Sequence, residues 1–272
     1  MQDYARFVIV TTGRSGSTWL VQALNSHSEV VCFGSPFEVG SDYVSFDVEG
    51  YDNFDARARS LRDRDGIAFL NSYIFGEHAA DTKAAGFKFQ YRNWIGFGEV
   101  INALVADRGL KVIHLRRDNL LRSLISFRLT RATGQYHRRP RQIGWRQALL
   151  ALRHPARAAQ RLPSLLKRRQ YVAPGLTLST EECSEFFMQT RMQERRFDEM
   201  FEGRELLDIT YEAMVDDFPA TSQRVLEFIG VRPEPLTYSQ QPLNVQPIRA
   251  LLTNFDELQD AYRDTAAAAF FD

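Results

Sequence analysis

Residues 7–20 read FVIVTTGRSGSTWL, and this stretch decides the fold. The apolar, β-branched run from Phe7 to Val10 predicts a buried strand, and a turn with two glycines follows it. From Trp19 onward, apolar residues recur with helical spacing. A strand, a small-residue loop and a helix start form an anion cradle, because the first N–H groups of the helix lack partners and the helix dipole adds about half a positive charge there.

The side chains of the loop fit such a cradle. Gly13 and Gly16 allow an anion to approach the backbone closely, and Arg14 supplies a permanent cation suited to phosphate or sulfate oxygens. Hydroxyl groups add further donors, at Ser15, Ser17 and Thr18. We therefore expect all of these residues to contact a bound anion.

The loop differs from a Walker A motif, G-x-x-x-x-G-K-[ST], at two positions. Thr11 replaces the first glycine, and Ser17 stands where the lysine would be. Because that lysine reaches the β- and γ-phosphates, its absence argues against transfer of a phosphoryl group from magnesium-bound nucleotide. A P-loop-type small-molecule kinase and a catalytically idle nucleotide-binding module remain as alternative functions.

The composition is that of a globular protein. The chain has 272 residues, 44% of them hydrophobic and 25% charged, and a formal net charge of zero. We expect a single domain over residues 1–272, with no electrostatic reason to bind nucleic acid. The two cysteines have no metal-ligand spacing and no disulfide pattern, and no stretch resembles a signal peptide or a membrane span. These features predict a cytoplasmic protein.

Strand-like and helix-like segments alternate along the chain. We expect strands at 30–33, 85–89, 111–115 and 205–211, and helices at 17–26, 56–75, 95–106, 119–132, 181–201, 219–229 and 254–262, the second of them broken at Gly66. Residues 42–55 have weak periodicity and predict an irregular surface excursion. This alternation predicts an α/β fold with a mainly parallel sheet covered on both faces.

Residues 12–20, TGRSGSTWL, resemble the 5′-phosphosulfate loop of sulfotransferases. They are most similar to the bacterial carbohydrate and glycolipid branch, which includes trehalose and Nod-factor sulfotransferases. The resemblance implies a P-loop NTPase-like, three-layer α/β/α fold with helical insertions. It implies 3′-phosphoadenosine-5′-phosphosulfate (PAPS) as the sulfuryl donor, no metal, and a place for Trp19 beside the donor.

A second segment, VIHLRRDN at 112–119, resembles the 3′-phosphate site of the same family, in which an arginine at a strand end acts with a serine of the next helix. A phosphate suits a guanidinium fork and a hydroxyl donor near a helix start. We assign the arginine to Arg117, because side chains alternate along a strand and Arg116 then points elsewhere. Ser126 is the preferred serine, with Ser123 one helical turn earlier as the alternative.

The segment GSPFE at 34–38 is similar to the turn that carries a catalytic glutamate in the bacterial enzymes. A hydroxyl group needs a positioned base before it attacks sulfur, so Glu38 is the predicted base and Arg14 the stabiliser of the developing charge. Ser35 stands where relatives often have a carboxylate, and we assign it to acceptor binding. The competing bases are His27 and Asp42, whereas His114 lies in an apolar strand and reads as a core residue.

The remaining predictions concern the acceptor and its surroundings. Lys88 and His137 are predicted to bind the acceptor, a hydroxyl-bearing carbohydrate or glycolipid. The segment at about 138–175 is predicted to be a basic helical insertion. It is interpreted either as a solvated face or as a surface through which a cytoplasmic protein associates peripherally with anionic membrane. A homo-oligomer is compatible with the sequence. Further expectations are packing for Tyr211 and Glu212, and contacts to the donor for Gln246 and Arg249.

Overall fold

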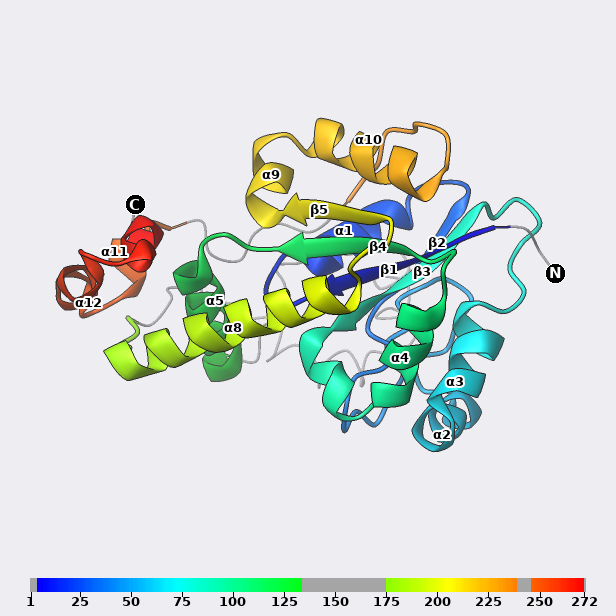
Figure 1. The fold of residues 1–272 in the computed structure, drawn as a ribbon, viewed down its shortest axis with the longest axis horizontal. Helices are drawn as coiled ribbons and strands as arrows, with labels where there is room; N and C mark the ends of the chain where they lie inside the picture. Colours follow the sequence, from blue (N-terminus) through cyan, green and yellow to red (C-terminus); the bar gives the residue numbers. More distant parts are fainter. Residues whose placement is uncertain (1–3, 134–174, 239–245, 272) are drawn as a thin grey trace, which may run out of the picture.

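A five-stranded, entirely parallel sheet forms the centre of the computed structural model, which describes residues 4–133, 175–238 and 246–271 (Figure 1). The strand order is β2-β3-β1-β4-β5. The strands are β1 (Ala5–Thr11), β2 (Val30–Phe33), β3 (Ala84–Gln90), β4 (Lys111–Arg116) and β5 (Leu206–Thr210). The α/β class expected from the alternating pattern is confirmed.

Helices cover both faces of the sheet. Alternate residues of β1 point to opposite faces, so Phe7 and Ile9 enter one apolar cluster and Val8 and Val10 the other. The first face is covered by α1 (Ser17–Leu24), α9 (Tyr211–Asp216) and α10 (Phe218–Ile229). The second is covered by α2 (Ala56–Arg64), α3 (Gly66–Phe69), the π-helical turn η1 (Leu70–Ile74), α4 (Gly98–Ala106) and the C-terminal part of α8 (Thr180–Met200). The fold is therefore a three-layer α/β/α sandwich.

A third apolar cluster lies beyond the carboxyl ends of the strands (Figure 1). It joins α5 (Leu120–Thr133) and the N-terminal part of α8 to the C-terminal segment, which contains α11 (Ile248–Leu251), α12 (Phe255–Tyr262) and the 3₁₀ helix η3 (Ala266–Phe271). A second 3₁₀ helix, η2 (Tyr91–Ile95), follows β3. Helices α5 and α8 and those of the C-terminal segment therefore border the carboxyl edge of the sheet.

The strand order places β1 at a point where chain connections diverge. The helix after β1 packs on one face, whereas the helices that follow β2 and β3 pack on the other. In such sheets a crevice opens at the carboxyl ends of the strands where the connections separate, and ligands bind there. The loop at 12–16 lies at this point, between the ends of β3 and β4.

Two sequence expectations differ from the structure. Residues 42–55 are irregular, but they are not purely a surface excursion: Val44 and Phe46 are fully buried, and Ser45 pairs with Ser35. The strand predicted at 205–211 gives way to α9 at Tyr211, because the Thr210 hydroxyl accepts a hydrogen bond from the Ala213 N–H and caps a helix too short to show periodicity. The break predicted at Gly66 within the helix at 56–75 is confirmed: α2 ends at Arg64, and α3 begins at Gly66 with the Asp65 carboxylate as its cap.

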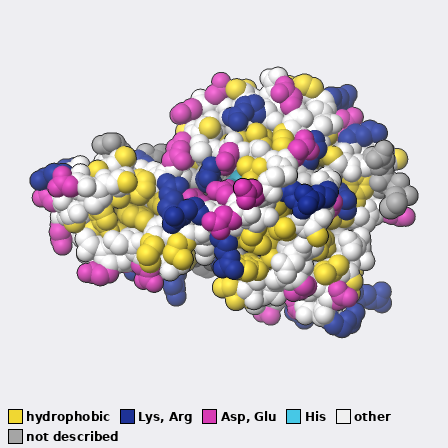
Figure 2. All heavy atoms as spheres, viewed as in Figure 1, with side chains coloured by type: hydrophobic (Ala, Val, Ile, Leu, Met, Phe, Trp, Pro, Cys, Tyr) yellow, Lys and Arg dark blue, Asp and Glu magenta, His cyan; other side chains and the backbone are white. Residues whose placement is uncertain are grey.

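One face of the molecule carries both signs of charge. Figure 2 shows Lys and Arg side chains interspersed with Asp and Glu side chains over the region of β4, β5 and α8. The ion pairs of Arg116 with Asp198 and Asp208, at 3.3 and 2.6 Å, contribute to this arrangement. In the part of the chain that the structure describes, no helix has the length and apolar character needed to cross a bilayer. His137 and residues 138–174 lie outside the described residues.

Candidate functional site

The loop after β1 has an unusual backbone. Arg14 has φ of 66° and Gly16 has φ of 82°, both in the left-handed region. A Cβ atom at position 16 would lie 2.5 Å from the ring of Tyr211, so only glycine fits there. The hydroxyl of Ser15 bonds to that of Thr11 at 2.6 Å and to the Thr12 carbonyl at 3.0 Å. Ser15 therefore fixes the loop with its side chain and leaves the backbone to face a ligand.

The N-terminus of α1 is free of a side-chain cap. Gly16 is the N-cap residue and has no side-chain oxygen to accept a hydrogen bond, and the first turn contains no acidic residue. The N–H groups of that turn, from Ser17 onward, are the groups that an anion satisfies at a helix start. The left-handed loop and the uncapped helix end have the geometry that the predicted anion cradle requires.

Arg14 connects this cradle to the end of β4 and to α5. Its Nε donates a hydrogen bond to the hydroxyl of Ser126 at 3.0 Å, and its carbonyl accepts one from Nη1 of Arg117 at 3.0 Å. Residues from two sequence motifs, more than a hundred positions apart, are thereby in direct contact. The left-handed backbone of Arg14 costs about 1–2 kcal/mol, which these two hydrogen bonds offset.

Arg117 is almost fully buried beside the loop. Its guanidinium lies 4.3 Å from the ring centre of Tyr211, and its Nε is 3.9 Å from a carboxylate oxygen of Glu212. Burial lowers the pKa of Arg117, because desolvation disfavours the charged form, and Glu212 opposes the effect. The Nε atom makes no hydrogen bond, so this buried cation has donor capacity left for an anion.

Three other predicted donor contacts have different environments. Ser123 is completely buried and its hydroxyl makes no hydrogen bond, whereas Ser126 bonds to Arg14. The ring of Trp19 stacks on Phe218 at 4.8 Å, and the indole Nε1 has no partner. The structure thus brings Ser126 to the cradle and places Trp19 in an aromatic group on the α10 side. Gly13 has open space around its Cα apart from the side chain of Gln90.

Lys88 lies on β3 next to the cradle. It pairs in register with Ile9, on the face covered by α1, and its ammonium donates to the hydroxyl of Thr18 at 3.4 Å. The residue is only 6% exposed. Burial lowers the pKa of Lys88, and the carboxylates of Asp47 and Glu38 oppose that shift. A buried cation therefore stands between the donor loop and the segment that carries Glu38.

Glu38 forms a short ion pair with Arg92 at the rim of this region. Its side chain is 29% exposed, so solvent and an incoming acceptor can both reach the carboxylate. Ser35 is buried, and its hydroxyl accepts a hydrogen bond from the Gln90 amide at 3.4 Å. Lys88 and Gln90 are two residues apart on one strand, so both point to the same face.

Of the two competing bases, His27 is buried and Asp42 is exposed, and His114 is a core residue as predicted. His27 is buried with both ring nitrogens engaged: Nε2 bonds to the Arg232 carbonyl at 3.0 Å, and Nδ1 accepts from the Glu29 N–H at 3.0 Å. His114 is buried in β4, 2.5 Å from the Tyr91 hydroxyl and 2.8 Å from Asp198. Both histidines are thus held in the protein interior, away from an approaching hydroxyl. Asp42 is exposed on the loop that follows Glu38.

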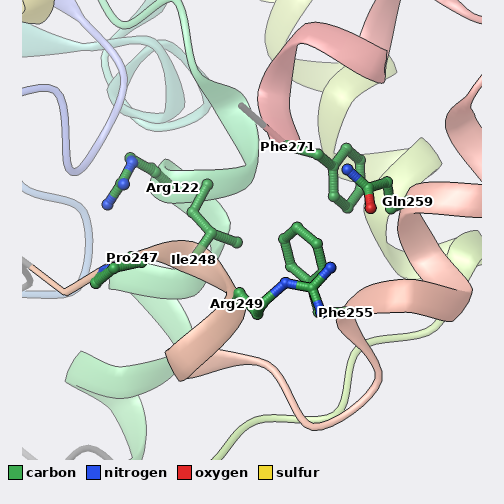
Figure 3. A pocket seen from close by; sticks show the side chains of 7 residues that line it. All are labelled: Arg122, Pro247, Ile248, Arg249, Phe255, Gln259 and Phe271. Atoms are coloured by element: carbon green, nitrogen blue, oxygen red, sulfur yellow. The ribbon is translucent and has the colours of Figure 1, made fainter.

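A pocket of about 440 Å³ lies between α5 and the C-terminal segment (Figure 3). It is lined by Arg122, Pro247, Ile248, Arg249, Phe255, Gln259 and Phe271. Arg122 donates to the carbonyl of Gln246 at 3.2 Å, and Arg249 lies over the ring of Phe255 and pairs with Asp256 at 2.7 Å. Arg249 is thus engaged within its own segment, while Arg122 shares α5 with Ser126.

Two residues near Arg117 have roles that sequence reasoning assigned only to packing. The carboxylate of Glu212 accepts hydrogen bonds from the N–H groups of Asp118 and Asn119, at 2.9 and 3.3 Å, just before α5 begins. Tyr211 packs on both Gly16 and Arg117. No local sequence pattern predicts these contacts, because they depend on the pairing of β4 with β5. Gln90, by contrast, could have been found from its i, i+2 spacing to Lys88.

Comparison with known proteins gives structural similarity only. No protein-family model matches the sequence, and no curated protein matches it significantly. A sulfotransferase from Alicyclobacillus acidocaldarius is similar with a TM-score of 0.48 and 12% identity, over 98% of each chain. A mouse sulfotransferase complexed with PAP has a TM-score of 0.35 and 14% identity, over 100% of this chain and 75% of that one. Retinol dehydratase in complex with retinol and PAP has a TM-score of 0.35 and 11% identity, over 97% and 83%. At these values the function must be argued from the site itself.

Proposed function

We propose that this protein is a sulfotransferase that moves a sulfuryl group from PAPS to a hydroxyl of a carbohydrate or glycolipid. The observation that carries the proposal is the junction at Arg14. Its side chain bonds to Ser126 and its carbonyl to Arg117, so the anion cradle and a second cationic site form one unit. A donor with phosphate groups on both the 3′ and the 5′ oxygen of an adenosine matches this pair of sites. The missing Walker lysine at position 17 disfavours Mg-ATP.

The residues of the site suit the donor group by group. Backbone N–H groups from Ser15 to Thr18, with Arg14, hold the 5′-phosphosulfate. Arg117 and Ser126 hold the 3′-phosphate, and the unpaired Nε of Arg117 is one of the donors available for it. Lys88 lies beside Thr18, where its ammonium meets the sulfuryl group from the acceptor side.

In the reaction, the Glu38 carboxylate takes the proton of the acceptor hydroxyl. The acceptor oxygen forms a bond to sulfur, and the bond between sulfur and the bridging phosphate oxygen breaks. Negative charge that grows on the bridging oxygen is stabilised by Arg14 and the helix N-terminus, and the product nucleotide leaves with that charge. A positioned base of this kind typically contributes about 10²–10⁴-fold to the rate.

Calorimetry tests the donor assignment. The protein is titrated with 3′-phosphoadenosine-5′-phosphate (PAP), ATP and ADP, each with and without magnesium. Tight binding of PAP alone, independent of the metal, is the expected result, because two phosphate sites must be filled. A preference for Mg-ATP would instead support the P-loop-type kinase. PAP binding without sulfuryl transfer to any hydroxyl acceptor would support the idle nucleotide-binding module.

The acceptor class is supported by the polar character of the groups around Glu38. Ser35, Gln90 and Lys88 offer hydrogen-bonding groups rather than an apolar slot at the carboxyl ends of β2 and β3. The same proposal includes contact of the basic segment at 138–175 with anionic membrane, since no acidic residue occurs between Asp118 and Glu181. Co-sedimentation with phosphatidylglycerol vesicles tests it: binding that weakens with salt is expected, and no binding at low salt would refute it.

A further inference from the structure

Asp47 lies beside the acceptor turn although it is 13 residues from Gly34. The Gly34 N–H donates to the Phe46 carbonyl at 2.8 Å, and the Lys88 N–H donates to the Gly34 carbonyl at 3.1 Å. Ser35 and Ser45 pair as an antiparallel bridge. These contacts pair the segment around Ser45 with the turn that follows β2, and they place the Asp47 carboxylate against Gly34.

The carboxylate of Asp47 is held in a fixed position. The Ser45 hydroxyl donates to its Oδ2 at 2.7 Å, and the Asn53 amide reaches its Oδ1 at 3.5 Å. A Cβ atom at position 34 would collide with this carboxylate, so Gly34 leaves room for it. Asp47 has φ of 55°, a left-handed conformation that aspartate and asparagine tolerate better than other side chains. The result is an exposed carboxylate fixed against the turn that contains Glu38.

The second observation is the incomplete bonding of the Lys88 ammonium. An ammonium group has three donors, and in the described part of the chain this one makes a single long hydrogen bond, 3.4 Å to Thr18. The residue is more than nine-tenths buried, so the other donors need a partner. Asp47 and Glu38 are close enough to raise the pKa of Lys88 against the effect of burial, yet neither forms an ion pair with it among the described residues.

We propose that Asp47 is the second carboxylate of the acceptor site and binds a hydroxyl adjacent to the one that is sulfated. The inference rests on the proposed sulfotransferase function. Glu38 takes the proton from the reacting hydroxyl, Lys88 donates to the reacting oxygen, and Asp47 accepts a hydrogen bond from the neighbouring hydroxyl. Asp47 thereby supplies the carboxylate that Ser35 does not.

This arrangement selects acceptors with vicinal hydroxyl groups. A sugar ring can donate to both carboxylates at once, whereas a phenol or a simple alcohol can donate to only one. A site built to accept a hydrogen bond discriminates against a ligand that lacks the donor, because the site's polar group then loses its partner. The acceptor is therefore a polyol rather than a monohydroxylated compound.

The test compares Asp47→Asn with wild type. Asparagine keeps the left-handed backbone but exchanges an anionic acceptor for a neutral amide. Glu49→Gln is the matched control, since it removes one negative charge from an exposed position of the same loop. The probes are methyl α-D-glucopyranoside, which has vicinal hydroxyls, and 4-nitrophenol, which has a single hydroxyl. Binding to the PAP-saturated protein is followed by NMR titration, and turnover is measured with PAPS.

We expect Asp47→Asn to weaken glucoside binding and raise its KM about tenfold, with 4-nitrophenol and PAP binding unchanged, and Glu49→Gln to behave as wild type. NMR of the Lys88 side chain gives a readout that needs no acceptor: its pKa falls in Asp47→Asn and not in the control. Equal glucoside affinity in Asp47→Asn and Glu49→Gln, or no glucoside binding to wild type, overturns this inference. If wild type still binds PAP in that case, the sulfotransferase proposal is not affected. Failure of wild type to bind PAP would overturn both the sulfotransferase proposal and the inference about Asp47.

Discussion

At the scale of single residues, Arg14 combines two tasks that usually fall to different groups. Its left-handed backbone shapes the anion cradle, and its side chain reaches Ser126 on α5. Non-glycine residues in this conformation occur where surrounding contacts enforce it, and such positions concentrate at functional sites. The guanidinium is therefore positioned before any ligand arrives.

Replacement of Arg14 by alanine removes that guanidinium. We expect Arg14→Ala to lower the sulfuryl-transfer rate by at least about 10²–10³-fold, the usual effect of losing one donor to a developing negative charge. Steady-state turnover with PAPS measures it, and Arg64→Ala, an exposed arginine of α2, is the control. A variant that keeps wild-type turnover would exclude Arg14 from the reaction.

Glu38 has a separable role. We expect Glu38→Gln to bind PAP like wild type, because the residue lies outside the cradle, while turnover falls by about 10²–10⁴-fold through loss of the base. Calorimetry and turnover on the same preparation separate the two effects. Full activity of Glu38→Gln would require another base, and Asp42 is then the next exposed carboxylate to replace.

At the scale of elements, the loop that carries Glu38 is tied to α2 by one buried arginine. Arg62 is 2% exposed and donates to three backbone carbonyls of the loop: those of Pro36 at 3.3 Å, Ser41 at 3.0 Å and Tyr43 at 2.9 Å. Asp63 balances its charge at 2.7 Å. A loop without regular structure is thus given a defined path by a single side chain.

Removal of Arg62 should release this loop. We expect Arg62→Ala to lower the free energy of unfolding by about 3 kcal/mol, because carbonyls that bond to a charged donor lose their partner. Acceptor KM rises as Glu38 loses its position, and PAP affinity stays near the wild-type value. Urea denaturation and steady-state kinetics test both effects. Arg62→Lys keeps the charge but reaches fewer carbonyls, so its values should fall between wild type and Arg62→Ala; equal KM values in all three proteins would contradict the positioning role.

At the scale of the whole molecule, the buried ammonium of Lys88 lowers the free energy of unfolding. Lys88 is a buried cation with a lowered pKa, so the folded protein releases its proton at a lower pH than the unfolded chain does. Below the folded pKa both states are protonated, and the full cost of burying the charge is present. As the pH rises through the folded pKa toward the ordinary value of 10.5, the unfolded state binds more protons and the cost disappears.

Lys88→Met is therefore expected to stabilise the ligand-free protein near neutral pH by about 1–4 kcal/mol while it abolishes turnover. The gain over wild type should shrink as the pH rises through the lowered pKa of Lys88 toward its ordinary value of 10.5. Urea denaturation at several pH values measures it, and Lys83→Met, an exposed lysine just before β3, controls for the change in net charge. Lower stability of Lys88→Met at neutral pH would show that the ammonium is stabilised, rather than strained, by its surroundings.

The fold could be predicted further than the acceptor site. The β1 strand, the glycine loop and the α1 start are encoded by neighbouring residues, so periodicity and turn chemistry suffice to locate them. The alternation of Arg116 and Arg117 at the end of β4 likewise follows from strand geometry. The short helix α9 and the burial of Phe46 could not be predicted, because their signals are shorter than one period or depend on a distant partner.

From the sequence alone one can derive the parallel α/β class, the strand, glycine loop and helix start at 7–24, and the position of Arg117 at the end of β4. Only the tertiary structure decided that Arg14 meets Ser126 and Arg117, that both ring nitrogens of His27 are occupied, and that Asp47 reaches the turn at Gly34. The physical reason is the range of the interactions. Backbone propensity and hydrophobic period act over a few residues, whereas these contacts join segments that meet only when the strands assemble in the order β2-β3-β1-β4-β5.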